Sequence, residues 1–117
     1  MSKGTIIVWL DGIEVGAKIA KLATINSYDL ELVDEIGSLG KLNGGVLIVD
    51  LNCINDNVLQ NISKLKGHNF FTLLGFYHDL TADVINNYSN FGFDIVLERK
   101  EFLNNLDPIV EKAFHAC

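Results

Sequence analysis

Cysteine, proline and basic residues are all scarce in this chain. Of its 117 residues, two are cysteine, one is proline and nine are lysine or arginine. Cys53 and Cys117 do not have the spacing of metal ligands, and so few cysteines are typical of reduced thiols in the cytosol. The single proline excludes collagen-like and proline-rich chains. The fifteen acidic residues give a formal charge of −6, which argues against nucleic-acid binding because that function needs a basic surface.

Long apolar runs are also missing. The longest, such as residues 6–10 and 46–49, fall far short of the roughly twenty residues that span a bilayer. The start of the chain has no apolar stretch long enough for a signal peptide, so we expect a cytoplasmic protein without membrane contact. Hydrophobic residues nevertheless make up 49% of the chain and charged residues 21%, which excludes disorder. The length predicts one domain, residues 1–117, with no output domain attached.

Short apolar or β-branched runs alternate with segments of helical period along the chain. Five runs predict strands: 5–10, 30–33, 46–49, 70–75 and 94–97. Between them, apolar residues recur at i, i+4 and i+7, as in Val15, Ile19 and Leu22, which predicts amphipathic helices. Residues 58, 62 and 65 repeat this spacing and predict a helix that ends at Gly67.

Helix boundaries are marked by capping residues in the second half of the chain. Thr81 is a favourable N-cap for a helix that closes at Gly92. Asp107 followed by Pro108 predicts the start of the last helix. Residues 34–45 contain four glycines and predict only a short, poorly formed helix.

The alternation of strands and helices predicts an α/β fold with a parallel sheet covered on both faces. Five β-α units with right-handed crossovers fit a three-layer α/β/α flavodoxin-like sandwich with strand order 2-1-3-4-5. Ligands bind such sheets beyond the carboxyl ends of the strands, at the switch point between strands 1 and 3.

Two carboxylates follow those two strands. Asp11 comes just after strand 1 and Asp50 ends strand 3. Together with Asn52 they predict a weak Mg²⁺ site, because Mg²⁺ prefers hard oxygen ligands. Asp50 is also a candidate phosphoryl acceptor, since aspartate forms acyl phosphates. The alternative is that these residues only cap helices or form Asx-turns.

The run Val46-Leu47-Ile48-Val49-Asp50-Leu51 resembles the phosphoacceptor strand of the receiver domain of response regulators. The resemblance covers essentially the whole chain and places Asp50 at the acceptor position. Several features depart from the family pattern. Gly12 stands where a second acid is usual, and Gly75 stands where a hydroxyl residue is expected at the end of strand 4. Either Arg99 or Lys100 occupies the position of the family's lysine.

These departures make the chain similar to a pseudo-receiver. The turn Gly75-Phe76-Tyr77-His78 and the segment Arg99-Lys100-Glu101-Phe102 resemble motifs of that subgroup. The resemblance implies a stand-alone, non-enzymatic protein that acts in signalling or regulation through protein–protein contacts and is not switched by phosphorylation. His78 lies on the same rim, where a metal or proton-transfer role competes with the plainer role of a surface or capping residue.

Two other functions remain open from the sequence. One is a true phosphoacceptor receiver of a phosphorelay, with Asp50 as the acceptor. The other is a small-molecule or nucleotide-binding module at the carboxyl rim of the sheet. No cofactor other than weakly held Mg²⁺ is expected. The partner is an unidentified protein. The face formed by the helix that follows Thr81, the strand 94–97 and the last helix is either a surface for a homodimer or plain solvated surface. Polar and charged residues on that face predict a modest contact: Asn86, Asn87, Asn90, Glu98, Arg99 and Lys100.

Overall fold

A computed structural model of the protein describes residues 4–9, 13–33, 45–52, 54–68 and 71–115. Five strands form one sheet, with all neighbours parallel and in the order β2-β1-β3-β4-β5. This order confirms the predicted topology. The strands are β1 (Thr5–Trp9), β2 (Asp29–Leu32), β3 (Val46–Asp50), β4 (Thr72–Tyr77) and β5 (Ile95–Glu98).

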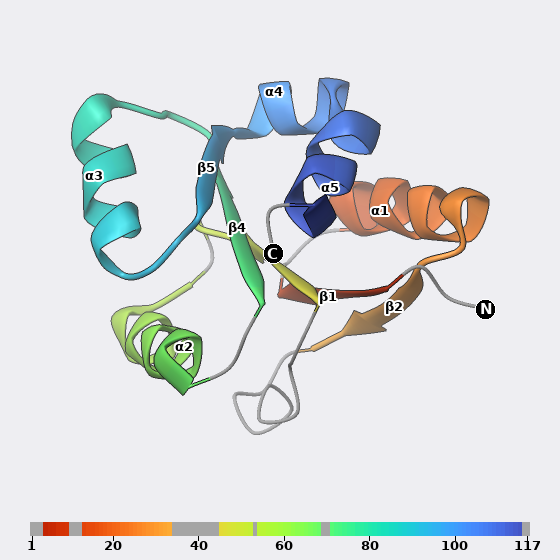
Figure 1. Ribbon diagram of the computed structural model, residues 1–117. Helices are drawn as coiled ribbons and strands as arrows, with labels where there is room; N and C mark the ends of the chain where they lie inside the picture. Colours follow the sequence, from red (N-terminus) through yellow and green to blue (C-terminus); the bar gives the residue numbers. More distant parts are fainter. Residues whose placement is uncertain (1–3, 10–12, 34–44, 53, 69–70, 116–117) are drawn as a thin grey trace.

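Helices cover both faces of the sheet (Figure 1). They are α1 (Ile13–Asn26), α2 (Asp56–His68), α3 (Ala82–Asn90), α4 (Arg99–Asn104) and α5 (Leu106–His115). Helices α1 and α5 lie on one face, and α2 and α3 lie on the other. None of the helices in the described part of the chain is long and apolar enough to cross a bilayer.

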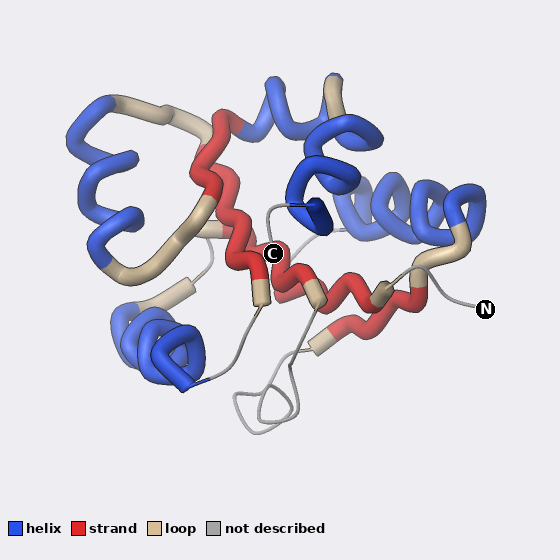
Figure 2. Tube along the Cα trace, viewed as in Figure 1, coloured by secondary structure: helices blue, strands red, loops and turns tan. Residues whose placement is uncertain are grey.

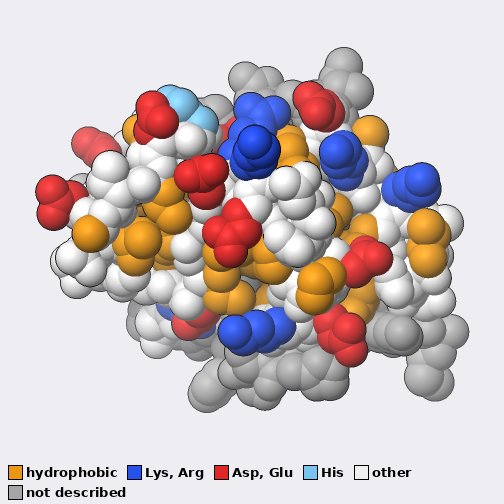
Figure 3. All heavy atoms as spheres, turned by 90° about the horizontal axis from the view of Figure 1, so that it is seen from above, with side chains coloured by type: hydrophobic (Ala, Val, Ile, Leu, Met, Phe, Trp, Pro, Cys, Tyr) orange, Lys and Arg blue, Asp and Glu red, His pale blue; other side chains and the backbone are white. Residues whose placement is uncertain are grey.

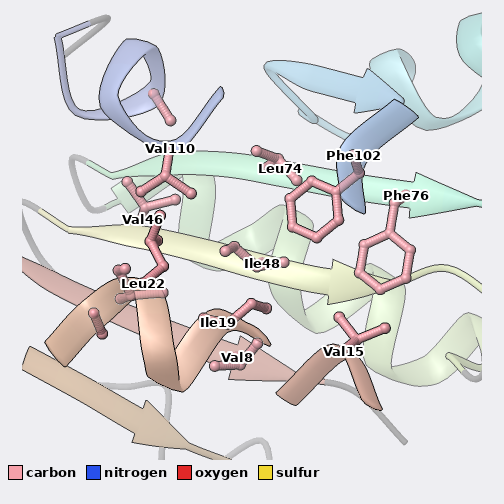
Figure 4. Packing of buried hydrophobic residues seen from close by; sticks show 13 residues of the cluster. Val8, Val15, Ile19, Leu22, Val46, Ile48, Leu74, Phe76, Phe102 and Val110 are labelled. Atoms are coloured by element: carbon pink, nitrogen blue, oxygen red, sulfur yellow. The ribbon is translucent and has the colours of Figure 1, made fainter. Parts of the chain in front are cut away.

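Strand β3 shows how the sheet divides the core into two clusters. Its residues are all buried, and successive side chains point to opposite faces. Val46 and Ile48 pack with α1 and α5, whereas Leu47 and Val49 pack with α2. Figure 4 shows the first cluster, in which the predicted stripe of α1 faces the sheet. Both faces of β3 are therefore shielded from water, which explains its unbroken apolar sequence.

Several boundaries differ from the sequence prediction. Strand β4 lies two residues later than expected, and α2 continues past Gly67 to His68. Helix α4 was not predicted; it is separated from α5 by Asn105 (Figure 2). Thr81 caps α3 as predicted, since its side chain accepts a hydrogen bond from the Val84 amide at 3.3 Å. The weak helix predicted over 34–45 falls almost entirely outside the described residues.

Lys66 links α2 to the strands beside it. Its Nζ lies 2.7 Å from Asp94 Oδ2, donates to the Phe71 carbonyl and stands 5.1 Å from the centroid of the Phe71 ring. Asp94 Oδ2 also accepts a hydrogen bond from the Leu73 amide at 2.8 Å. One ammonium group thus joins the last turn of α2 to the segments that enter β4 and β5.

Candidate functional site

Asp50 lies at the carboxyl end of β3, beside the switch point between β1 and β3. Its residue is only 6% exposed. The carboxylate atom Oδ1 accepts two hydrogen bonds from Asn52, one from the backbone amide and one from side-chain Nδ2, each at 3.0 Å. The backbone bond forms because β3 ends at Asp50 and the chain turns at once. Asn52 therefore covers one oxygen of the carboxylate with N–H donors.

The other end of the Asn52 amide faces the turn after β4. Its Oδ1 lies 3.5 Å from the backbone nitrogen of His78 and contacts the imidazole Nδ1. Across the ring, Nε2 is 3.6 Å from Asp79 Oδ2. The structure thus brings Asp50, Asn52 and His78 into one polar chain along the rim. Sequence analysis placed each residue on the rim but did not predict the contact between Asn52 and His78.

Gly75 does not end β4, which continues to Tyr77. It pairs with Val49 and is buried. A Cβ atom at this position would lie 2.8 Å from Leu51 Cδ1 and 2.9 Å from Phe93 Cε2. The core under the rim therefore fills the space that a side chain at Gly75 would need.

The last two residues of β4 point in different directions because the side chains of a strand alternate. Phe76 pairs with Asp50 and packs in the cluster of α1 and α5. Tyr77, the hydroxyl-bearing residue at the strand end, has its ring 6.2 Å from Tyr88 and 4.9 Å from His78, centroid to centroid. Burial raises the pKa of Tyr88, and the nearby Tyr77 and Asp56 raise it further. The rings of Tyr77 and Tyr88 therefore belong to one aromatic cluster between the end of β4 and α3.

The two candidates for the lysine position follow β5 directly. Arg99 and Lys100 open α4, with Arg99 half-buried and Lys100 exposed. Helix α4 is held in place by Phe102, whose ring stacks on Phe76 at 4.9 Å and 6°. Both rings are fully buried, and Figure 4 shows them side by side. The carboxyl edge of β4 and β5 is thus closed by a short helix instead of an open loop.

The Mg²⁺ site predicted from Asp11, Asp50 and Asn52 lies only in part within the described residues. Asp11 lies outside them, so its predicted pairing with Asp50 has no structural account here. Within the described ranges, no group of three histidine, cysteine, aspartate or glutamate residues could hold a metal ion. Asn52 turns its N–H groups toward Asp50 and its amide oxygen toward His78. A cation at Asp50 Oδ1 would therefore compete with the backbone and side-chain N–H donors of Asn52.

A second surface lies beside this rim, over the edge strand β5. The three apolar residues of β5 are only half-buried, and Ile85 of α3 is 38% exposed. A hollow of about 260 Å³ lies at the turn between α4 and α5. Figure 3, seen from above onto the side where α3 and α4 lie in Figure 1, shows hydrophobic side chains between acidic and basic ones. We call the combined surface of α3, β5, α4 and α5 the β5 face.

Comparison with known proteins identifies the fold. Sequence searches find no matching family profile and no matching curated protein. The chemotaxis protein CheY4 of Vibrio cholerae is 12% identical, with a TM-score of 0.77 over 94% of this chain and 98% of that one. This chain has the receiver fold. Full-length FixJ of B. japonicum is 18% identical, with a TM-score of 0.78; the match covers 98% of this chain and 59% of FixJ.

A third similar structure is described as a pilus assembly-related protein rather than as a chemotaxis protein or a response regulator. This protein of Burkholderia pseudomallei is 19% identical with a TM-score of 0.76. The match covers 97% of this chain and 91% of that protein. In this fold Asp50 lies at the carboxyl edge of the central strand β3.

Proposed function

We propose that this protein is a degenerate receiver that acts in signalling or regulation by binding another protein, without enzymatic activity and without a phosphorylation switch at Asp50. The observation that carries the proposal is the burial and hydrogen bonding of the Asp50 carboxylate. Asp50 is 6% exposed, and Oδ1 accepts hydrogen bonds from the backbone N–H and the side-chain Nδ2 of Asn52. Phosphoryl transfer to a carboxylate needs a metal ion and cationic or hydrogen-bonding groups on the transferred group.

The surroundings of Asp50 support the same conclusion. Gly75 offers no hydroxyl, and Leu51 and Phe93 fill the space beside it. Phe76, the strand neighbour of Asp50, is fully buried against Phe102. A phosphoryl group on Asp50 would therefore have little room to move β4, and a switch needs an element that the modification can bias.

Phosphorylation can be tested directly. The purified protein is incubated with phosphoramidate and Mg²⁺, and its intact mass is measured. We expect no phosphoryl adduct that disappears in Asp50→Asn. An Asp50-dependent adduct would instead identify a true phosphoacceptor receiver and refute the proposed mode of action.

The β5 face is the surface that we propose for partner binding, including a second copy of the chain. Its half-buried apolar strand residues and the exposed Ile85 are bordered by charged side chains (Figure 3), a pattern typical of modest, reversible contacts. Light scattering after size-exclusion chromatography, over a range of concentrations, tests self-association. We expect Ile85→Glu to weaken a dimer. The matched control is Ile25→Glu, since Ile25 is 68% exposed and lies on α1, which is not part of the β5 face. A strict monomer at high concentration would refute the homodimer.

A further inference from the structure

Asn52 has both ends of its side-chain amide engaged. Its Nδ2 donates to Asp50 Oδ1 at 3.0 Å, and its Oδ1 contacts His78 Nδ1. An amide turned by 180° would place its oxygen against a carboxylate oxygen, and two acceptors repel each other. The same rotation would take the acceptor away from the backbone N–H of His78, 3.5 Å from Oδ1. Both contacts therefore favour the one orientation that directs the NH₂ group at Asp50.

His78 helps to fix this orientation of the Asn52 amide, although it lies in a different loop. Asn52 follows β3, whereas His78 follows β4, so the contact joins two loops across the rim. With Oδ1 as an acceptor, Nδ1 must carry the hydrogen, which leaves Nε2 facing Asp79 Oδ2 at 3.6 Å. The side chain of His78 is 58% exposed and contributes little to the core. Its contact with Asn52 is thus separable from folding.

We infer that His78 is a positioning residue that holds the Asn52 amide on Asp50 and thereby weakens divalent-cation binding at this rim. This inference rests on the proposed function and gives a reason why Asp50 is not used as a phosphoacceptor. A cation at Oδ1 must displace the Nδ2–H donor, because the cation and the amide hydrogen compete for the same lone pairs of Oδ1. The backbone N–H of Asn52 stays in place with the turn, so the side chain is the part that His78 controls. The contact acts as an inhibitory latch built into the fold.

The test measures binding of Mn²⁺ alone to the full chain by electron paramagnetic resonance at one fixed pH for all variants. Removing the contact with His78→Ala is expected to tighten Mn²⁺ binding by about three- to tenfold, the net strength of one hydrogen bond. Asn52→Ala, which removes the donor itself, is expected to tighten binding at least as much. His78→Asn keeps a neutral donor near the position of Nδ1 and is expected to restore weak binding. Adding Asp50→Asn to either alanine variant is expected to abolish the gain.

Each outcome decides a different point. Equal Mn²⁺ affinity in the wild type, His78→Ala and Asn52→Ala would overturn the latch, as would a gain that persists with Asp50→Asn. A His78→Asn variant that binds as tightly as His78→Ala would show that hydrogen bonding is not the cause and would overturn it too. The proposed function is tested separately by the phosphoramidate experiment on the wild type. If the wild type takes no adduct and the variants gain no affinity, only the latch fails.

Discussion

The contacts of Lys66 give a sharp test of how this small domain is held together. Its ammonium group interacts with a carboxylate, a carbonyl and an aromatic face at once. The side chain of Lys66 is 24% exposed and that of Asp94 is 41% exposed, so solvent screens the ion pair and limits it to at most about 1 kcal/mol. The charged hydrogen bond to the Phe71 carbonyl contributes about 1.5 kcal/mol or more. The cation–π contact adds roughly 0.5 kcal/mol.

Lys66→Met removes these interactions while keeping most of the apolar stem. Allowing for non-additivity, we expect the free energy of unfolding to fall by about 2 kcal/mol. For a chain of this size the melting temperature should drop by roughly 8 °C. Urea unfolding followed by circular dichroism measures the change. The control is Lys64→Met on the same helix, where the side chain is exposed and the expected change is within about 0.5 kcal/mol. Equal effects of the two substitutions would refute the role assigned to Lys66.

Three further perturbations test the core and the site. Phe102→Ala removes the ring that stacks on Phe76, and the free energy of unfolding in urea should fall by about 3–5 kcal/mol. An unchanged unfolding midpoint would contradict the role of Phe102 in holding α4 against the sheet. Gly75→Ser places a Cβ 2.8 Å from Leu51 Cδ1, so we expect a loss of about 1–3 kcal/mol from overpacking and no gain of Mn²⁺ affinity. The raised pKa of Tyr88 means that the folded state keeps this proton to higher pH than the unfolded state. Stability should therefore fall as pH rises above about 10, and Tyr88→Phe should make that fall shallower in pH-dependent denaturation.

The fold could be predicted because its signals are local and repeated. Strand β3 is apolar on both faces, and Val15, Ile19 and Leu22 all lie buried on one face of α1. Helix α4 escaped prediction because it has six residues and a single buried one, Phe102, too few to show a period. Its position depends instead on the partner ring of Phe76, which comes from a distant part of the sequence.

The candidate site was predicted less completely than the fold. Asp50 was placed correctly on β3 because the end of an apolar strand is visible in the sequence. The contact of Asn52 with His78 depends on the register of β3 and β4, in which Asp50 pairs with Phe76. The predicted strand ended two residues too early, at Gly75, so the turn that carries His78 could not be placed against Asn52. An interaction between two loops requires both strand ends to be known.

The end of β4 connects the rim with both sides of the β5 face. Phe76 pairs with Asp50 and stacks on Phe102 of α4, whereas Tyr77 lies against His78 and against Tyr88 of α3. Because both rings of the Phe76 stack are fully buried, α4 cannot shift without exposing or repacking a large aromatic surface. Helix α3, in contrast, has no buried residue and depends on half-buried aromatic contacts. Motion on the β5 face should therefore be concentrated in α3. A partner that binds α3 would stabilise one of the positions of this helix without any chemical change at Asp50.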